Sequence, residues 1–383
     1  MKTRVLVLAF SHLSRDPRIF RQLKFLSLDP KFEVTAAGFD APLVAVHQFV
    51  SLPVFRSKSI LEKVLFATQL QILPAQTVYW RNPVVQAAMR ALKDQVYDLI
   101  IANDIETLPL ALALAGPKTK VILDAHEYTP KQFDGEWTFR TFWQPYWEAL
   151  CREFLPKVDG MMTVCNGIAK AYAHAYEVDP IVVTNAPFSA ECQPRPTDPN
   201  RINLVHHGLA KRARALENMI ELMRHLDGRF TLDLILVPDH KGYEAELRHL
   251  ARDLPQVHFK PPVPMPEISA MLNANYDLGL CLFPSGSANY NFILPNKFFE
   301  FVQGNLGVIT WSSPEIVAML QDAPCGVIVP WDVSSAAAHL RALTGPQVDG
   351  LKQASHLAAQ VWNAEQNRDK VMTLIDQVMG KGG

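Results

Sequence analysis

The strongest constraint on this chain is a regular alternation of short apolar runs with segments of helical periodicity. Val5 to Phe10 is a continuous apolar run, typical of a strand buried on both faces of a parallel sheet. Asp16 and Pro17 then start a segment in which apolar residues recur at helical spacing over 19–26. The same sequence of features repeats along most of the chain. It predicts parallel sheets with helices on both faces, joined by right-handed crossovers.

The alternation is interrupted once, by a proline-rich segment. Residues 185–201 contain Pro187, Pro194, Pro196 and Pro199 with little periodicity, which favours a linker. Before it, strands are expected at 32–37, 97–102, 120–123, 160–164 and 181–183, and helices at 108–114, 140–154 and 166–176. After it, strands are expected at 202–205, 232–237, 257–259, 277–283 and 306–310, and helices at 213–226, 243–253, 267–272 and 296–301.

The chain has 383 residues, which at about 150 residues per domain predicts two domains. We expect an N-terminal domain over 1–187, a C-terminal domain over 188–365 and a terminal segment over 366–383. The expected fold class is α/β, with two doubly wound, Rossmann-like domains and a cleft between them. Open parallel sheets bind ligands beyond the carboxyl ends of their strands, so candidate site residues are sought there.

Composition excludes several classes of protein. Lys plus Arg number 37 and Asp plus Glu 38, so the formal net charge of −1 provides no general basic field for nucleic acid. The five cysteines are scattered without C-x-x-C spacing, which predicts reduced thiols in a cytosolic compartment. The first apolar run is too short for a signal sequence, and no apolar stretch is long enough to span a membrane. We therefore expect a cytoplasmic protein.

Polar and ionisable residues follow three predicted strands of the N-terminal domain. The loop after the first strand leads into a helix and suits hydroxyl or anion binding; it contains His12, Arg15, Asp16 and Arg18. Two later strands are followed by Asn103-Asp104 and by Asp124-Ala125-His126-Glu127. We expect a carboxylate to orient His126, and His126 to bind a sugar or phosphate. The alternative is that the acids cap helices and His126 is polar surface.

A basic segment follows the predicted strand 202–205. Gly208 is followed by Lys211, Arg212 and Arg214 at the start of a predicted helix, where acidic residues would suit the helix dipole better. The segment therefore favours a diphosphate site. The alternative is a solvated basic turn.

A second anion-binding position is predicted after the strand 277–283. The loop 284–294 leads to a helix N-terminus at Pro295 and Asn296, where free backbone amides and Lys297 are suited to an anion. Glu300, one turn further on, can accept hydrogen bonds from two hydroxyls of a ribose. The alternative is an exposed Glu300 paired with Lys297 at i, i+3.

Motifs for other chemistries are absent. The sequence has no G-x-G-x-x-G, G-x-S-x-G, H-E-x-x-H or P-loop pattern, so it does not indicate an NAD enzyme, a serine hydrolase or a zinc protease. It has no D-x-D pair for a divalent cation bound with a nucleotide. No metal site and no cofactor are expected.

Taken together, these segments resemble the retaining GT-B glycosyltransferases of family 4, especially those of bacterial polysaccharide assembly. The resemblance covers nearly the whole chain. It is carried by Arg15-Asp16-Pro17-Arg18, Asp124-Ala125-His126-Glu127, the Gly208 turn with Arg214 and Glu217, and, most specifically, Leu294-Pro295-Asn296-Lys297-Phe298-Phe299-Glu300. Trp362 resembles the aromatic residue before the family's closing helix, which implies that 366–383 form a helix crossing back to the N-terminal domain.

The resemblance implies how the candidate residues are used. The C-terminal domain would bind a UDP- or GDP-linked sugar, and the N-terminal domain the acceptor. Arg214 and Lys297 would stabilise the leaving diphosphate, with His126 beside the transferred sugar. Lys211 or Arg212 would replace a second cation that usually lies nearer Gly208. The donor would also contact Asn291, Leu294, Pro295, Asn296 and Glu300, and the acceptor side would comprise His12, Arg15, Asp16, Arg18, Asp104 and Glu127.

The chain departs from this family at Phe292, where the first Glu of an E-x7-E motif would lie, so the donor sugar stays open and loop amides or Asn291 would substitute. Two further readings follow: a nucleotide-sugar epimerase or hydrolase of the same architecture, and an inactive paralogue that only binds a sugar nucleotide or partner proteins.

Residues 53–93 are basic and apolar. One acid, Glu62, accompanies six cations, giving a net charge of +5: Arg56, Lys58, Lys63, Arg81, Arg90 and Lys93. Such a stretch indicates either contact with an anionic membrane and a lipid-linked acceptor, or an amphipathic helix with its apolar side in the core.

Overall fold

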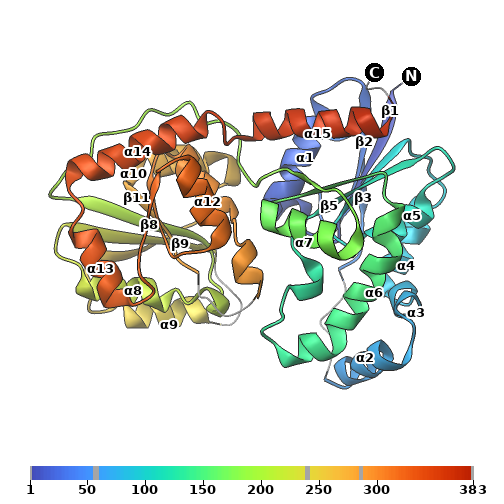
Figure 1. Cartoon of the computed structure of the whole chain (residues 1–383), viewed down its shortest axis with the longest axis horizontal. Helices are drawn as coiled ribbons and strands as arrows, with labels where there is room; N and C mark the ends of the chain where they lie inside the picture. Colours follow the sequence, from blue (N-terminus) through green and yellow to red (C-terminus); the bar gives the residue numbers. More distant parts are fainter. Residues whose placement is uncertain (1, 55–59, 238–241, 284–287, 381–383) are drawn as a thin grey trace. The chain divides into compact units, whose positions relative to one another are not determined.

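The computed structural model describes residues 2–54, 60–237, 242–283 and 288–380. They form two compact units (Figure 1). Unit 1 comprises Met1–Thr184, Ser287–Phe292 and Asn367–Gly383, and unit 2 comprises Asn185–Gly286 and Ile293–Gln366. Among the described residues, no helix has both the length and the hydropathy needed to cross a bilayer.

Unit 1 is built on a seven-stranded parallel sheet in the order β3-β2-β1-β4-β5-β6-β7. The strands are β1 (Thr3–Leu8), β2 (Phe32–Gly38), β3 (Gln48–Ser51), β4 (Leu99–Asn103), β5 (Lys120–Ala125), β6 (Gly160–Thr163) and β7 (Ile181–Val182). The helices are α1 (Pro17–Ser27), α2 (Ile60–Ile72), α3 (Ala75–Trp80), α4 (Pro83–Leu92), α5 (Leu108–Leu114), α6 (Gln144–Phe154), α7 (Asn166–Tyr176) and α15 (Ala364–Val378), with a π-helical turn at Phe139–Trp143.

Local sequence signals explain the first crossover of this sheet. β1 is buried along nearly its whole length, as expected for a strand covered on both faces. Asp16 caps α1, since its Oδ1 accepts hydrogen bonds from the backbone amides of Arg18 and Ile19 at 3.0 and 3.2 Å. Pro17 occupies the first helical position, where its missing amide hydrogen costs nothing. The predicted helix start is confirmed.

Unit 2 contains a six-stranded parallel sheet in the order β10-β9-β8-β11-β12-β13. The strands are β8 (Ile202–Leu209), β9 (Phe230–Val237), β10 (Val257–Lys260), β11 (Leu278–Cys281), β12 (Gly307–Thr310) and β13 (Gly326–Ile328). The helices are α8 (Glu217–His225), α9 (Tyr243–Leu250), α10 (Ile268–Asn275), α11 (Asn296–Gln303), α12 (Pro314–Asp322), α13 (Val333–Arg341) and α14 (Gly345–Ala359). The predicted class, two doubly wound α/β sheets, is confirmed.

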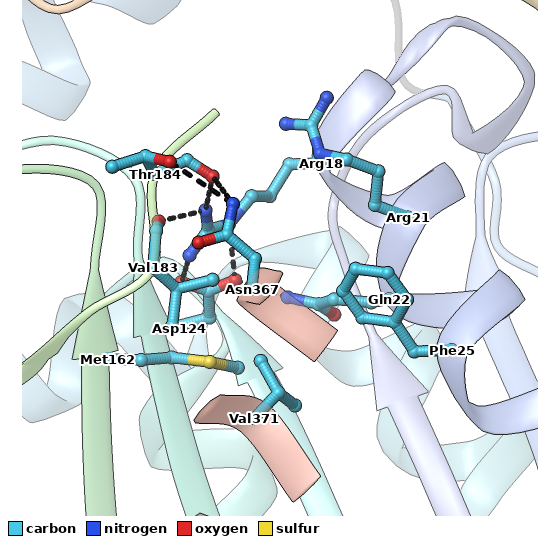
Figure 2. Close-up of a pocket in the computed structure, with 10 residues that line it drawn as sticks. All are labelled: Arg18, Arg21, Gln22, Phe25, Asp124, Met162, Val183, Thr184, Asn367 and Val371. Atoms are coloured by element: carbon cyan, nitrogen blue, oxygen red, sulfur yellow. Dashed lines mark hydrogen bonds and ion pairs between the residues drawn. The ribbon is translucent and has the colours of Figure 1, made fainter. Parts of the chain in front are cut away.

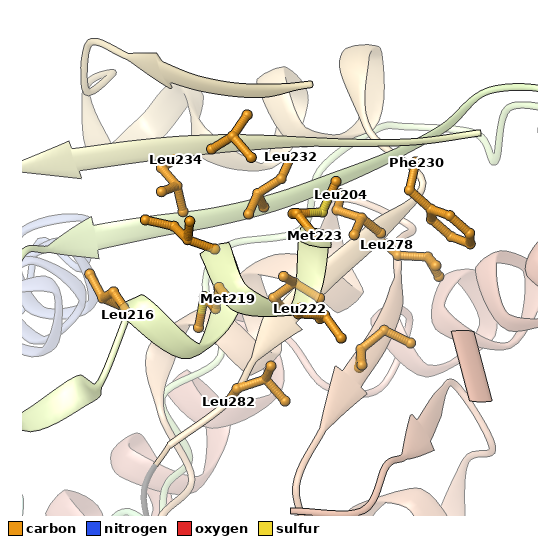
Figure 3. Packing of buried hydrophobic residues seen from close by; sticks show 14 of the residues in the cluster. Leu204, Leu216, Met219, Leu222, Met223, Phe230, Leu232, Leu234, Leu278 and Leu282 are labelled. Atoms are coloured by element: carbon orange, nitrogen blue, oxygen red, sulfur yellow. The ribbon is translucent and has the colours of Figure 1, made fainter. Parts of the chain in front are cut away.

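The core of unit 2 lies between this sheet and its helices. Leu204, Leu232 and Leu278 come from three adjacent strands and are fully buried against Leu216 and Met219 at the start of α8 (Figure 3). Burying one such leucine contributes on the order of 2 kcal/mol. This packing fixes the position of β8, whose carboxyl end carries the predicted basic segment.

A buried ion pair fastens α14 inside unit 2. Lys352 Nζ lies 2.8 Å from Asp277 Oδ1 and 3.4 Å from Thr197 Oγ1. The other carboxylate oxygen of Asp277 accepts the backbone amide of Asn203 at the start of β8. Because Lys352 is 2 % exposed, its charge depends on this carboxylate.

Several boundaries differ from those predicted, and two of them change the site. β8 runs on to Leu209, so His206, His207 and Gly208 belong to the strand and do not follow it. α8 begins at Glu217, four residues after the predicted start at 213, because Ala215 adopts a left-handed φ of 47° after a short turn at Arg212–Arg214. The cations therefore do not lie in the first turn of α8, where they would oppose the helix dipole.

In unit 1, β5 runs on to Ala125, so Asp124 lies within the strand and is no helix cap. Chain segments without a clear apolar period also formed elements that were not predicted, including β3, β13, α3 and α12.

The last helix, α15, has residues in both units, and those from Asn367 onward group with unit 1. There Asn367 Nδ2 donates to the Thr184 carbonyl at 3.0 Å, and Val378 and Leu374 pack against Gly160, where a Cβ would lie 3.0 Å from the valine. Trp362 lies just before the helix, with its ring centroid 6.0 Å from that of Phe298.

Candidate functional site

The candidate site in unit 2 begins at Gly208, near the carboxyl end of β8. Its φ is 116°, a conformation that side chains rarely adopt. A Cβ at this position would lie 3.3 Å from Arg214 Nη1 and 3.7 Å from Lys297 Nζ. Two cations from segments far apart in the sequence therefore meet beside a backbone position that only glycine leaves open.

Arg214 comes from the short turn after β8. Its Nη1 donates to the Leu209 carbonyl at 3.2 Å, which turns the guanidinium back toward the strand. The side chain is partly buried, and this desolvation lowers the pKa of Arg214. The guanidinium stays charged at any physiological pH.

Lys297 reaches the same place from the first turn of α11. The residue is 5 % exposed, and its Nζ lies 3.0 Å from His206 Nε2 and 5.4 Å from the ring centroid of Phe283. Burial and the nearby Arg214 guanidinium lower the pKa of Lys297 to about 7. A bound anion therefore stabilises the charged form of this buried lysine more than it would that of an exposed lysine.

These two cations lack a carboxylate partner at close range. Within the described part of the chain, neither Arg214 nor Lys297 forms an ion pair with an acidic side chain, although Glu300 acts on Lys297 from farther away. Burial raises the pKa of the Cys281 thiol beside them to about 12, so this group is neutral. The arrangement favours a bound anion with several oxygens.

Glu300 lies one helical turn beyond Lys297 and is 8 % exposed. Its Oε2 is 3.4 Å from Nε2 of His207, whose pKa burial lowers to about 3. Because the His207 imidazole is neutral, it does not offset the negative charge of the Glu300 carboxylate. The reading of Glu300 as an exposed helical residue is wrong.

The other predicted donor-binding residues are less closely grouped. Lys211 is exposed, and Arg212 forms an ion pair with Glu246 of α9 and lies over the Tyr243 ring at 4.9 Å. Neither comes as near to the Gly208 Cβ position as Arg214 and Lys297 do. Leu294 is buried, Pro295 is the N-cap of α11 and Asn296 is its first residue. Residues 284–287 of the preceding loop lie outside the described residues.

Asn291 and Phe292 belong to unit 1, although they fall within the range expected for the second domain. Asn291 is exposed. The Phe292 ring centroid is 6.0 Å from that of Tyr128, and its carbonyl is 3.6 Å from Cys165 Sγ. Phe292, which replaces the expected glutamate, is thus packed with aromatic and cysteine side chains of unit 1.

His126 in unit 1 lies between carboxylates. Its Nδ1 is 3.3 Å from Asp104 Oδ2, and its Nε2 is 3.6 Å from Asp124 Oδ2 and 3.2 Å from Asn103 Oδ1. Desolvation would lower the pKa of His126, but these carboxylates outweigh it and raise the pKa to about 9. His126 is therefore a cation held by Asp104, with a fifth of its side chain exposed.

Asp104 is not a helix cap either. It adopts a φ of 60°, and its Oδ1 accepts the backbone amide of His126 at 2.8 Å. The expectation that a carboxylate orients His126 agrees with this geometry. Glu127 follows on the same loop, where its carbonyl accepts the Tyr172 hydroxyl at 3.0 Å.

Arg18 and Asp124 form a buried bidentate ion pair, with both N–O distances at 2.7 Å (Figure 2). Arg18 also donates to the Thr184 carbonyl, and Asn367 donates to the same residue. The small pocket that Arg18 and Asp124 line with Gln22 and Val371 has room for no more than about one water molecule. This pair supports the fold of unit 1, and a sugar does not fit the pocket.

The remaining residues of the first loop are more exposed. His12 Nδ1 lies 3.1 Å from Asp40 Oδ2, and Arg15 is exposed beside it. Asp16 caps α1 with one oxygen and accepts from Ser11 Oγ at 2.9 Å with the other. The acceptor-side roles of this loop stay predictions.

His206 and His207 were not assigned a role from the sequence, although two consecutive histidines at the carboxyl end of a strand are a usable signal. Among the residues that the structure describes, no cluster of three or more His, Cys, Asp or Glu residues could hold a metal ion.

Comparison with known proteins supports the architecture. By sequence, no family model and no curated protein matches the chain. Among solved structures, the chain is similar to sucrose-phosphate synthase from Thermosynechococcus elongatus, with a TM-score of 0.72, 14% identity, and coverage of 99% of this chain and 100% of that one.

Two further structures give the same result. Anabaena HepE in complex with UDP and glucose has a TM-score of 0.68 at 14% identity, covering 98% of this chain and 100% of that one. Trehalose 6-phosphate synthase from Burkholderia multivorans has a TM-score of 0.67 at 12% identity, with both chains fully covered. The chain therefore has the GT-B fold, two Rossmann-like sheets in one polypeptide, as its sequence predicted.

Proposed function

We propose that the chain is a glycosyltransferase that moves a hexosyl group from a UDP- or GDP-linked sugar to a saccharide or lipid-linked saccharide. The observation that carries this proposal is the convergence of Arg214 and Lys297 on Gly208 at the carboxyl end of β8. The HepE structure, whose fold is similar, contains UDP, and this likeness supports the proposal.

The chemistry follows from the charges of this site. When the anomeric C–O bond breaks, its electron pair stays on the diphosphate, which gains a negative charge. Arg214 and Lys297 stabilise that charge as it develops, because hydrogen bonds between charged groups are strong in a partly buried site. Glu300 is proposed to bind the ribose hydroxyls, next to the phosphates along α11.

We further propose that transfer retains the configuration, as in family 4. The acceptor oxygen attacks from the face that the diphosphate leaves, and a phosphate oxygen takes the acceptor proton. No nucleophilic side chain is needed for this step. His126, a cation beside Asp104 in unit 1, is proposed to bind hydroxyl or phosphate oxygens of a substrate.

A donor screen tests the proposed function. The purified chain is incubated with UDP- and GDP-hexoses, with and without saccharide acceptors, and products are followed by mass spectrometry and by NMR of the anomeric proton. We expect one donor class to be consumed only with an acceptor and the product to keep the anomeric configuration. Consumption without an acceptor would instead identify an epimerase or hydrolase.

One observation favours the reading as an inactive nucleotide-binding paralogue. Phe292 replaces the glutamate that contacts the sugar in family 4, and it is packed against Tyr128 of unit 1. In that case UDP or GDP binds, but no donor is consumed with any acceptor. Binding together with transfer would exclude this reading.

Membrane contact is proposed through α2 and the aromatic segment that packs against it. On α2, Val64, Leu65 and Ile72 are more than half exposed, which disfavours a helix with its apolar side in the core. Gln71 Nε2 donates to the Thr141 carbonyl at 2.8 Å, and the ring centroids of Phe66 and Trp143 are 5.3 Å apart, so the partly exposed Trp143 adjoins α2. Arg56 and Lys58 of the predicted basic stretch lie outside the described residues.

Liposome flotation tests this contact. We expect the chain to float with vesicles containing anionic lipid, and Val64→Ser with Leu65→Ser to leave it in solution. A wild-type chain that stays in solution with every lipid mixture would contradict the proposal.

A further inference from the structure

His206 is a buried histidine that the transfer chemistry proposed above does not use. It is fully buried near the carboxyl end of β8, and its Nδ1 lies 2.9 Å from the Leu280 carbonyl of β11. A carbonyl oxygen only accepts hydrogen bonds, so Nδ1 carries the ring proton. Burial and the Lys297 charge lower the pKa of His206 well below its usual value, so the ring stays neutral.

This tautomer gives Nε2 one function. With the proton on Nδ1, Nε2 has a free lone pair and accepts a hydrogen bond from Lys297 Nζ, 3.0 Å away. The Lys297 amine is thereby directed toward β8, where it lies 3.7 Å from the Cβ position of Gly208. The two hydrogen bonds of the His206 ring, one to the Leu280 carbonyl and one from Lys297 Nζ, fix the position of this amine.

Lys297 is surrounded by few charges that favour its ammonium form. From β8 it faces His206 and His207, both neutral; from the turn after β8, Arg214; from β11, the neutral thiol of Cys281; and from its own helix, Glu300. Burial and Arg214 outweigh Glu300 and lower the pKa of Lys297 to about 7. At pH 8 most of these amines are then uncharged.

We propose that His206 is a positioning residue, which holds the Lys297 amine over Gly208 so that this amine takes up one proton when the diphosphate of a nucleotide binds there. The inference rests on the proposed function, because it assigns a diphosphate to this site. Only one N–H bond forms: the Nζ lone pair takes a proton from solvent, and no bond between heavy atoms changes. Nucleotide affinity is thus coupled to pH through one buried amine.

Calorimetry with UDP and GDP at pH 8 tests the coupling, since phosphate groups are then ionised and do not contribute protons of their own. Titration in buffers of different ionisation enthalpy gives the number of protons taken up. We expect the wild type to take up most of one proton per bound nucleotide, because the pKa of the free Lys297 amine is lowered. Lys297→Arg should bind with almost no uptake, because arginine is already charged.

Two substitutions isolate His206. His206→Leu removes the acceptor and should weaken nucleotide binding roughly tenfold or more, the effect of one hydrogen bond to a charged group. His206→Gln places an amide oxygen within reach of Nζ and should recover most of this loss. His225→Leu, which removes an exposed histidine of α8, is the control and should bind like the wild type. Circular dichroism confirms that each variant is folded.

The failure of this inference is separable from that of the proposed function. If nucleotide binds without proton uptake, or if His206→Leu binds as tightly as the wild type, the inference is overturned and the function stands. If neither nucleotide binds, NMR of the Lys297 side chain still decides it, with sulfate as the probe. A titration midpoint of the Lys297 amine near pH 7 that rises with sulfate supports the inference. A midpoint at the ordinary 10.5, or one that sulfate does not move, overturns it.

Discussion

The substitution Gly208→Ala adds a single methyl group where a phosphate oxygen is proposed to bind. The new Cβ would lie 3.3 Å from Arg214 Nη1 and 3.7 Å from Lys297 Nζ. A phosphate oxygen accepts hydrogen bonds from such cations at about 2.7–2.9 Å, so the methyl group and the oxygen compete for the same space. We expect the variant to lose nucleotide affinity.

The size of this loss follows from the contacts that the methyl group displaces. A hydrogen bond to a charged group contributes about 1.5–3 kcal/mol. Since about 1.4 kcal/mol corresponds to a factor of ten, losing one contact weakens binding roughly 10- to 100-fold, and losing both weakens it further. The φ of 116° adds a folding cost of about 1–3 kcal/mol, because alanine is strained there.

Gly242→Ala separates these two effects. Gly242 belongs to the same unit and has a φ of 78°, but among the described residues no atom lies within 4 Å of a Cβ built there. We expect both variants to unfold at lower urea concentration than the wild type, while only Gly208→Ala loses UDP or GDP binding in calorimetry. If Gly208→Ala binds as tightly as Gly242→Ala, the anion site does not lie at Gly208.

Three further predictions follow from the two units. Arg214→Ala or Lys297→Ala should lower the rate of transfer by 100-fold or more, on the order of the loss of one electrostatic donor, with a urea midpoint close to the wild type; near wild-type rates in both would defeat the assignment. Lys352→Ala leaves the buried Asp277 carboxylate without its cation and should reduce the free energy of unfolding by about 3–5 kcal/mol in urea titrations. A loss below about 1 kcal/mol would contradict the buried ion pair. The pKa of His126 is raised in the fold to about 9, so its stabilisation is present below the unfolded value of 6.5 and is lost as the pH rises through 9. In urea titrations, the free energy of unfolding of the wild type should therefore fall by about 3 kcal/mol from pH 6 to pH 9.5, and that of His126→Gln should not. An equal pH dependence in the two proteins would refute this prediction.

The apolar periodicity was sufficient to predict the two sheets. Buried strands such as β1 and β12 are continuous apolar runs, and their positions are confirmed within a few residues. The strand β8 was predicted to stop at Val205, before the polar His206 and His207. It continues to Leu209 because His206 is satisfied by Leu280 and Lys297, contacts that no local pattern reveals.

The candidate site could be predicted only in part, because some of its contacts join distant segments of the chain. Arg214, Lys297 and Glu300 were identified from their positions after strands and at a helix start. The second cation beside Gly208 was expected from Lys211 or Arg212, but Lys297 is the residue that comes near, 89 positions away along the chain. Arg212 is drawn to Glu246, and Arg18 to Asp124, by ion pairs between distant segments that depend on the tertiary fold.

A crystal structure of the chain with UDP, and a second with GDP, tests the central claim most directly. One of the two nucleotides should place its phosphates beside Gly208, in contact with Arg214 and Lys297, and its ribose hydroxyls on Glu300. Nucleotide bound at another place, or absent from this site at saturating concentration, would contradict the account.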